Sequence, residues 1–209
     1  MKHEWRKKEK EFYLPKNKPE VIDIPKFNFL TISGEGNPNS EFFSEYIGAL
    51  YSVSYPIKMT LKKRPKPDGY SDYTVYPLEG VWDINEEAKK TFNGTVNKDD
   101  LVFKLMIRQP GFVSEDFAKE MIELARRKKP NELISEVKFE CINEGKCIQM
   151  MHIGSYDNEP ESFEIMEGFA ETQNMKRVSK IHREIYLSDF RKVAEEKLKT
   201  VLRFSVTPG

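Results

Sequence analysis

Apolar and polar positions repeat with two different periods along the chain. In "KFNFLTISGEG", Phe27, Phe29 and Thr31 share one side of a predicted strand that ends at glycines. A helix beginning near Asn39 is expected next, with apolar residues at helical spacing: Phe42, Phe43, Tyr46, Ile47, Leu50 and Tyr51. After the break at "RPKPDG", further strands are expected in "DYTVYPLEGVW" and "DLVFKLMIRQP". The first half of the chain therefore predicts a βαββ unit.

The second half follows a similar order. We expect a helix capped by Ser114, a hairpin in "EVKFECINEGKCIQMMHIG" that turns at residues 143–145, a helix in "EPESFEIMEGFAE" and a strand in "KIHREIYLSD". A helix started by Ser188 is expected after that, and "RFSV" closes the chain as a short strand. The inward residues predicted for this last helix are Phe190, Val193, Ala194, Leu198, Val201 and Leu202.

A weak internal repeat supports a duplication. When the sequence is shifted by 120 positions, Gly34 falls on Gly154 and Phe43 falls on Phe163, as Gly48 does on Gly168. The pattern predicts an α+β fold in which duplicated βαββ units form one curved antiparallel sheet, with helices on one face and a central ligand pocket.

The predicted domain organisation is simple. Residues 1–24 are charged and contain two prolines, so we expect an extended N-terminal arm. Residues 25–209 are expected to form a single domain, whose two βαββ halves cover about 25–112 and 113–209.

Composition excludes several classes of partner. The 34 basic and 34 acidic residues balance, so no overall field attracts nucleic acid or an anionic membrane. No apolar run approaches the roughly 20 residues of a membrane span, and the basic N-terminus lacks the apolar stretch of a secretory signal. We therefore expect a cytoplasmic protein without direct nucleic-acid or membrane contacts. Cys141 and Cys147 are expected to be free thiols, and the sequence does not indicate an oligomeric state.

The strand "KIHREIYLSD" has an unusual alternation. Ile181, Ile185 and Leu187 are predicted to pack beneath the helices, so the opposite face carries Glu184 between a histidine and a tyrosine. From the alternation alone, Glu184 is also compatible with a solvated carboxylate paired to a lysine. A carboxylate walled by aromatic rings would instead suit recognition of a cation or activation of a water molecule.

Three stretches resemble the GyrI-like small-molecule-binding family: "MMHIGSYDNEPESFEIMEGF", "HREIYLSD" and "EEKLKTVLRFSV". "FLTISGEGNPNSEFFSEYIGALYSVSY" and "YTVYPLEGVW" are similar to its longer stand-alone subfamily, which includes cyclopropanoid hydrolases. The resemblance implies a duplicated βαββ (SHS2-like) fold and an aromatic pocket with one buried glutamate, which matches Glu184 here. It also implies ligands that are hydrophobic, polycyclic or cationic.

The resemblance makes Glu184 the candidate catalytic residue. Trp82 is interpreted as either a pocket wall or core, and Glu79 as a second acid or, preferably, a surface salt bridge. The other candidate ligand contacts are Tyr55, Tyr73, Tyr156, Tyr186 and His182. The three histidines are scattered, so no metal site is expected, and no cofactor motif is present.

Two functions follow from the resemblance. One is hydrolytic opening of cyclopropane-bearing alkylators, a detoxification in which Glu184 positions water. The alternative is a non-catalytic module that binds or sequesters hydrophobic or cationic compounds. A third interpretation, direct inhibition of a topoisomerase, lacks support from any local acidic patch.

Overall fold

The computed structural model describes residues 2–128 and 131–209, and they form two compact units. Unit 1 contains residues 2–4 and Phe27–Ile142, and unit 2 contains Trp5–Lys26 and Asn143–Gly209. Each unit combines helices with an antiparallel sheet, so the α+β class predicted from the sequence is confirmed. The division into sequence halves near residue 112 stays a prediction.

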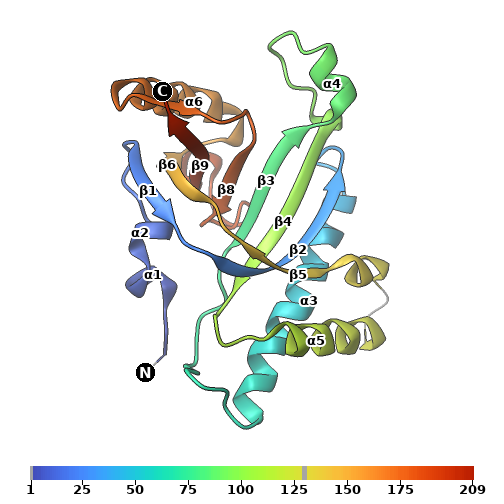
Figure 1. The fold of residues 1–209 in the computed structure, drawn as a ribbon. Coiled ribbons are helices and arrows are strands. Elements are labelled where there is room, and N and C mark those ends of the chain that lie inside the picture. Colours follow the sequence, from blue (N-terminus) through green and yellow to red (C-terminus); the bar gives the residue numbers. More distant parts are fainter. Residues whose placement is uncertain (1, 129–130) are drawn as a thin grey trace. The chain divides into compact units, whose positions relative to one another are not determined.

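Unit 1 has a four-stranded sheet in the order β3-β4-β2-β5 (Figure 1). Helices α3 and α5 pack against each other, and α3 also packs on β4 and β2. Ser114 caps α5 through a hydrogen bond that its Oγ accepts from the amide of Phe117, as the sequence predicted. The elements are β2 (Phe27–Glu35), α3 (Phe42–Lys63), β3 (Leu78–Ile84), α4 (Glu86–Lys90), β4 (Leu101–Gln109), α5 (Glu115–Lys128) and β5 (Lys138–Ile142).

Unit 2 has the strand order β1-β6-β9-β8, and β7 pairs with another part of β9. Helix α6 packs on β6, and the core between them contains Ile148, Met150, Met166, Leu202 and Phe204. The elements are α1 (Trp5–Lys8), α2 (Lys10–Tyr13), β1 (Glu20–Ile24), β6 (Gly145–Ile153), α6 (Glu159–Thr172), β7 (Met175–Arg177), β8 (His182–Tyr186) and β9 (Lys199–Pro208).

The two units share one βαββ topology. In unit 1 the order β2-α3-β3-β4 places β4 between β3 and β2, and in unit 2 the order β6-α6-β8-β9 places β9 between β8 and β6. The two glycines that the repeat matches, Gly34 and Gly154, are required for different physical reasons. A Cβ at Gly34 would lie 2.6 Å from the ring of Phe103, whereas Gly154 has a positive φ of 136° at the end of β6.

One strand of each sheet comes from a distant part of the chain. β1 directly precedes β2 in sequence but pairs with β6, and β5 directly precedes β6 but pairs with β2. The hairpin predicted around residues 143–145 is therefore wrong: β5 and β6 follow each other closely in the sequence, but each strand pairs with other strands. Both strands show the alternation of a hairpin because each of them pairs antiparallel with other strands.

The N-terminal segment is not the extended arm that its prolines and charges predicted. It contains α1, α2 and β1, and Trp5 and Tyr13 are buried with ring centroids 5.1 Å apart. Two buried aromatic side chains outweigh the polar composition because each removes a large apolar surface from water.

The helix predicted from Ser188 is also wrong. Residues 188–198 form turns and one short 3-10 segment (Glu195–Lys197), and β9 begins at Lys199. The helical spacing was coincidental, since Val201 and Leu202 lie in one strand and point to opposite faces. Phe190, expected to point inward, is 62 % exposed.

Candidate functional site

Strand β8 alternates as predicted, but its two faces are the reverse of the predicted ones. His182 contacts Phe163 of α6 with ring centroids 4.6 Å apart, and Glu184 is paired in register with Leu202 of the α6-facing core. Glu184 therefore lies on the face that α6 covers, whereas Ile185 lies on the opposite face. The prediction failed because a period of two separates the faces of a strand but does not say which one a helix covers.

Glu184 is a buried carboxylate, 8 % exposed, with a hydrogen-bond partner on each oxygen. The Tyr186 hydroxyl donates to Oε2 at 2.7 Å, and Nε2 of His182 lies 3.1 Å from Oε1. All three residues belong to one face of β8, so the strand period itself places the two partners on either side of the carboxylate. These contacts fix the orientation of the Glu184 carboxyl group.

The orientation of His182 is set by a second contact. Its Nδ1 lies 3.2 Å from the carbonyl oxygen of Lys180, while Nε2 faces Glu184. The two contacts together fix the direction of the ring, so that Nε2 faces Glu184.

A second buried acid, Glu159, was not among the predicted site residues. It is the first residue of α6 and is 6 % exposed, and its Oε1 has no hydrogen-bond partner within the part of the chain that the structure describes. One oxygen of Glu159, one of Glu184 and one ring nitrogen of His182 lie within 4.8 Å of one another. The two acids therefore face each other across the space between α6 and β8.

Burial raises the pKa of Glu159 well above its ordinary value, and the neighbouring Glu184 and Asp157 carboxylates raise it further. Burial therefore favours the protonated form of Glu159. Two adjacent carboxyl groups in unlike environments are the arrangement that acid–base sites use. The signal in the sequence is the pair Glu159-Pro160, which predicts the start of a helix but not a buried acid.

Two tyrosines border the acid pair. Tyr156 contacts Tyr186 edge to face, with ring centroids 6.0 Å apart. Burial and the nearby Glu184 charge raise the pKa of Tyr156 to about 12, so its hydroxyl remains a hydrogen-bond donor at neutral pH. The structure thus brings together four predicted site residues, namely Glu184, His182, Tyr186 and Tyr156.

His152 is a structural histidine, as predicted. Its Nε2 donates to the carbonyl oxygen of Ser155 at 2.9 Å, and its Nδ1 is hydrogen-bonded to the Ser162 hydroxyl at 2.9 Å. Both ring nitrogens are therefore satisfied by groups at the start of α6 and in the loop before it. This ring helps to hold the end of α6 that carries Glu159.

The donor atoms of Glu159, His182 and Glu184 are close enough to surround a small cation. However, the Tyr186 hydroxyl and His182 already account for both oxygens of Glu184. We therefore describe the cluster as a hydrogen-bonded acid pair. The absence of a metal and of a cofactor stays a prediction.

The other predicted contacts belong to unit 1. Trp82 packs in an aromatic cluster with Phe43 and Phe103, at centroid distances of 5.9 and 5.5 Å. Tyr73 is buried, whereas Tyr55 is 52 % exposed on α3. Their roles as ligand contacts stay predictions. Unit 1 also corrects one expectation, because Glu79 is buried and therefore does not lie on the surface, where the preferred interpretation had placed it.

Comparison with known proteins assigns the chain to a family. Residues 17–206 match the family described as the GyrI-like small molecule binding domain. The chain belongs to the GyrI-like family. A crystal structure of a hydrolase from Listeria innocua is 38 % identical, with a TM-score of 0.86, and the match covers 98 % of this chain and 100 % of that one. The chain is therefore a small-molecule-binding domain by family.

Two further structures are similar to this GyrI-like chain. An uncharacterized conserved protein from Listeria innocua is 39 % identical, with 98 % of this chain and 100 % of that chain covered and a TM-score of 0.86. The C-terminal domain of EcmrR is 11 % identical over 92 % of this chain and 98 % of that one, with a TM-score of 0.52, so it shows the fold alone. No curated protein matches the sequence significantly.

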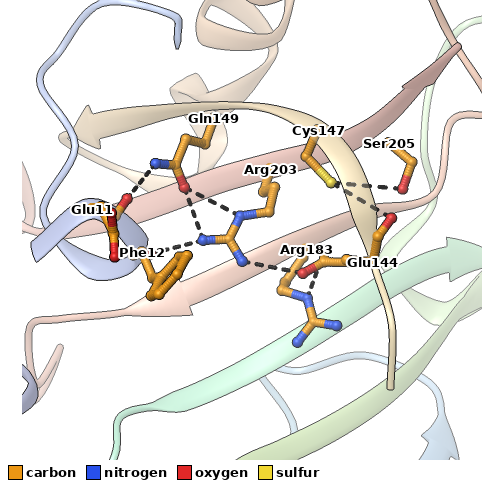
Figure 2. A network of polar contacts seen from close by, with 8 residues as sticks. All are labelled: Glu11, Phe12, Glu144, Cys147, Gln149, Arg183, Arg203 and Ser205. Carbon is orange, nitrogen blue, oxygen red and sulfur yellow. Dashed lines mark hydrogen bonds and ion pairs between the residues drawn. The ribbon is translucent and has the colours of Figure 1, made fainter. Parts of the chain in front are cut away.

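The face of the unit 2 sheet opposite the acid pair carries a second polar cluster (Figure 2). Arg183 and Arg203 form ion pairs with the Glu144 carboxylate, at 2.9 and 3.1 Å. Burial opposes the charge of Glu144, but these two arginines keep its pKa below the ordinary value. Arg203 also donates to the Phe12 carbonyl at 2.7 Å and to Gln149 at 2.8 Å. This cluster holds the N-terminal segment against the sheet and is structural.

The remaining sequence predictions concern cysteines and membranes. Cys141 and Cys147 are free, as expected, and burial raises the pKa of the Cys147 thiol to about 11. This thiol is therefore unreactive at neutral pH. Within the described residues, no helix combines the length and apolar character that crossing a membrane requires.

Proposed function

We propose that this GyrI-like domain binds hydrophobic, polycyclic or cationic compounds at the Glu184 cluster and opens the cyclopropane ring of alkylating compounds by adding water. The observation that carries the proposal is the buried Glu184 carboxylate, held between the Tyr186 hydroxyl and His182. A carboxylate fixed in this way can accept a proton from a water molecule in a defined direction. The identity to a protein described as a hydrolase supports a reaction over binding alone.

The proposed reaction is a displacement at a strained carbon. Water attacks a cyclopropane carbon that is conjugated to a carbonyl, and Glu184 takes the proton of the attacking water. The new C–O bond forms as a cyclopropane C–C bond breaks, and the electron pair moves to the carbonyl oxygen. Tyr156, which keeps its proton at neutral pH, donates a hydrogen bond to this oxygen. The oxygen then takes up the released proton, so one water is added overall.

The aromatic side chains contribute binding. Tyr156 and Tyr186 present rings beside the Glu184 carboxyl group, so a flat cation can gain stacking and cation–π contacts of about 0.5–2 kcal/mol each.

Incubation with a duocarmycin-like compound tests the reaction. We expect a product heavier by one water, and isotopically labelled water should place its oxygen in that product, as read by mass spectrometry. Glu184→Gln should abolish turnover. Glu164→Gln, an exposed glutamate on α6, is the matched control and should retain it. Full turnover by the folded Glu184→Gln variant would reject the catalytic assignment.

Non-catalytic binding is the second candidate, and the charge of the buried Glu184 carboxylate favours it. In this case Glu184→Gln should weaken binding of a cationic dye more than binding of a neutral analogue. An equal loss for both compounds would indicate misfolding and would contradict charge recognition.

A further inference from the structure

If both carboxyl groups of the acid pair were ionised, their negative charge would exceed the charge of one monocation. Glu184 has a hydrogen-bond partner on each oxygen, whereas Glu159 is buried and its Oε1 has no partner among the described residues. The two carboxyl groups and His182 lie within 4.8 Å of one another. At this distance two carboxylates repel strongly in a poorly solvated site. The pair is therefore expected to carry one negative charge when no ligand is bound.

We infer that Glu159 and Glu184 share one proton at neutral pH and that a ligand with two positive charges binds by displacing it. A single-charged ligand balances Glu184 and leaves the proton in place. A second positive charge makes ionised Glu159 favourable, so the proton leaves to solvent. The site would thus accept both charge classes and distinguish them by one proton. This inference rests on the proposed function only in requiring that ligands reach Glu184.

The groups around the pair agree with this proton count. Asp157 and Tyr156 lie just before α6, and both the Asp157 and Glu184 charges oppose ionisation of Glu159. On β8, Tyr186 and His182 contact Glu184. Other groups facing this region are committed elsewhere: Arg177 to Glu167, Asp189 to Arg191, and His152 to Ser155 and Ser162.

The position of Glu159 gives it a role that a surface acid does not have. It begins a 14-residue helix, whose N-terminal end favours negative charge. Burial and Glu184 oppose that charge, so ionisation of Glu159 depends on what else enters the site. A dication supplies the missing positive charge directly. Glu159 is therefore a specificity residue in this proposal, and Glu184 is the shared contact of both ligand classes.

Two matched probes test the charge count. N-methyl-4-phenylpyridinium has one positive charge, and N,N′-dimethyl-4,4′-bipyridinium has two on nearly the same two-ring frame. Neither probe has an ionisable proton, so any proton released comes from the protein. Isothermal titration calorimetry at neutral pH, repeated in buffers of different ionisation enthalpy, gives the number of protons released on binding.

For the wild type we expect no release with the monocation and about one proton with the dication. Glu159→Gln should abolish the release and weaken the dication by about tenfold, with little effect on the monocation. His182→Gln should retain the release, which separates Glu159 from the histidine as its source. Dication binding without proton release, or unchanged release in Glu159→Gln, would overturn the inference.

The shared proton can also be detected in the protein without a ligand. Infrared spectroscopy of the wild type at neutral pH should show the carbonyl band of a protonated carboxyl group, and Glu159→Gln should lack its deuterium-sensitive component. Absence of the band in the wild type would refute the shared proton. If neither probe binds, the dication inference fails, while the cyclopropane turnover assay still decides the proposed function independently.

Discussion

Replacing Arg203 by methionine should strongly destabilise unit 2, because this side chain joins the sheet to the N-terminal segment. Its guanidinium donates to Gln149 at 3.2 and 2.8 Å, to Glu144 at 3.1 Å and to the Phe12 carbonyl at 2.7 Å. Methionine keeps much of the apolar stem but donates none of these bonds. The buried Gln149 oxygen and the Phe12 carbonyl then lose a donor, and Glu144 loses one of its two arginines.

The magnitude follows from these losses. A buried acceptor without its donor costs about 1–3 kcal/mol, and breaking one side of a buried ion pair costs about 3–5 kcal/mol. The losses overlap, so we expect the free energy of unfolding to fall by about 3–5 kcal/mol. With a urea dependence of about 2 kcal/mol per M, the unfolding midpoint should fall by roughly 2 M urea.

Urea unfolding followed by tryptophan fluorescence measures this midpoint, and Trp5 reports from the same unit. Arg64→Met is the matched control, because Arg64 also makes two hydrogen bonds to a carboxylate, at 2.9 and 2.6 Å to Glu120. Both of those side chains are 48 % exposed, so water replaces the lost contacts and the midpoint should not move. Equal midpoints for Arg203→Met and the wild type would refute the reasoning.

Three further predictions test other parts of the molecule. Tyr186→Phe removes the 2.7 Å donor from Glu184 and should lower turnover about tenfold with an unchanged circular dichroism spectrum; unaltered kinetics would contradict the orienting role. The folded-state pKa of Glu144 is depressed, so its stabilisation is present above the unfolded value of about 4.3 and is lost as pH falls through the folded value. Urea midpoints from neutral to acidic pH should therefore show Glu144→Gln less stable at neutral pH, with the gap narrowing on acidification; a constant gap would exclude this linkage. Gly34→Ala should destabilise by about 1–3 kcal/mol because its Cβ would meet an aromatic ring at 2.6 Å, whereas Gly48→Ala, with open space within α3, should raise the melting temperature; similar melting curves for both variants would disprove the crowding argument.

Local patterns predicted the regular elements well where one face is clearly apolar. The strand at Phe27–Glu35 and the helix at Glu115–Lys128 have the periods expected of half-buried elements. The prediction of a helix after Ser188 was wrong because the apolar spacing there fits a helix by chance. The structure of β9 is determined by its pairing with three other strands. Tertiary pairing of this kind has no signal within a short window.

The candidate site was predicted in part for a similar reason. The alternation around Glu184 correctly grouped it with His182 and Tyr186, because all three lie on one strand face. Glu159 was missed because its distance from Glu184 depends on where α6 lies over β8. An acid in the first turn of a helix is so common that it does not indicate a buried partner.

The strand exchange has a consequence for how the chain matures during synthesis. β1 emerges early, but its partner β6 begins only at Gly145, and β2 must wait until β5 ends at Ile142 for its second neighbour. A nascent chain therefore holds an open sheet edge through most of translation, and such edges attract foreign strands. All strands of unit 1 have emerged once Ile142 is made, whereas β1 of unit 2 waits for β6, so unit 2 cannot complete its sheet before unit 1 has been synthesised.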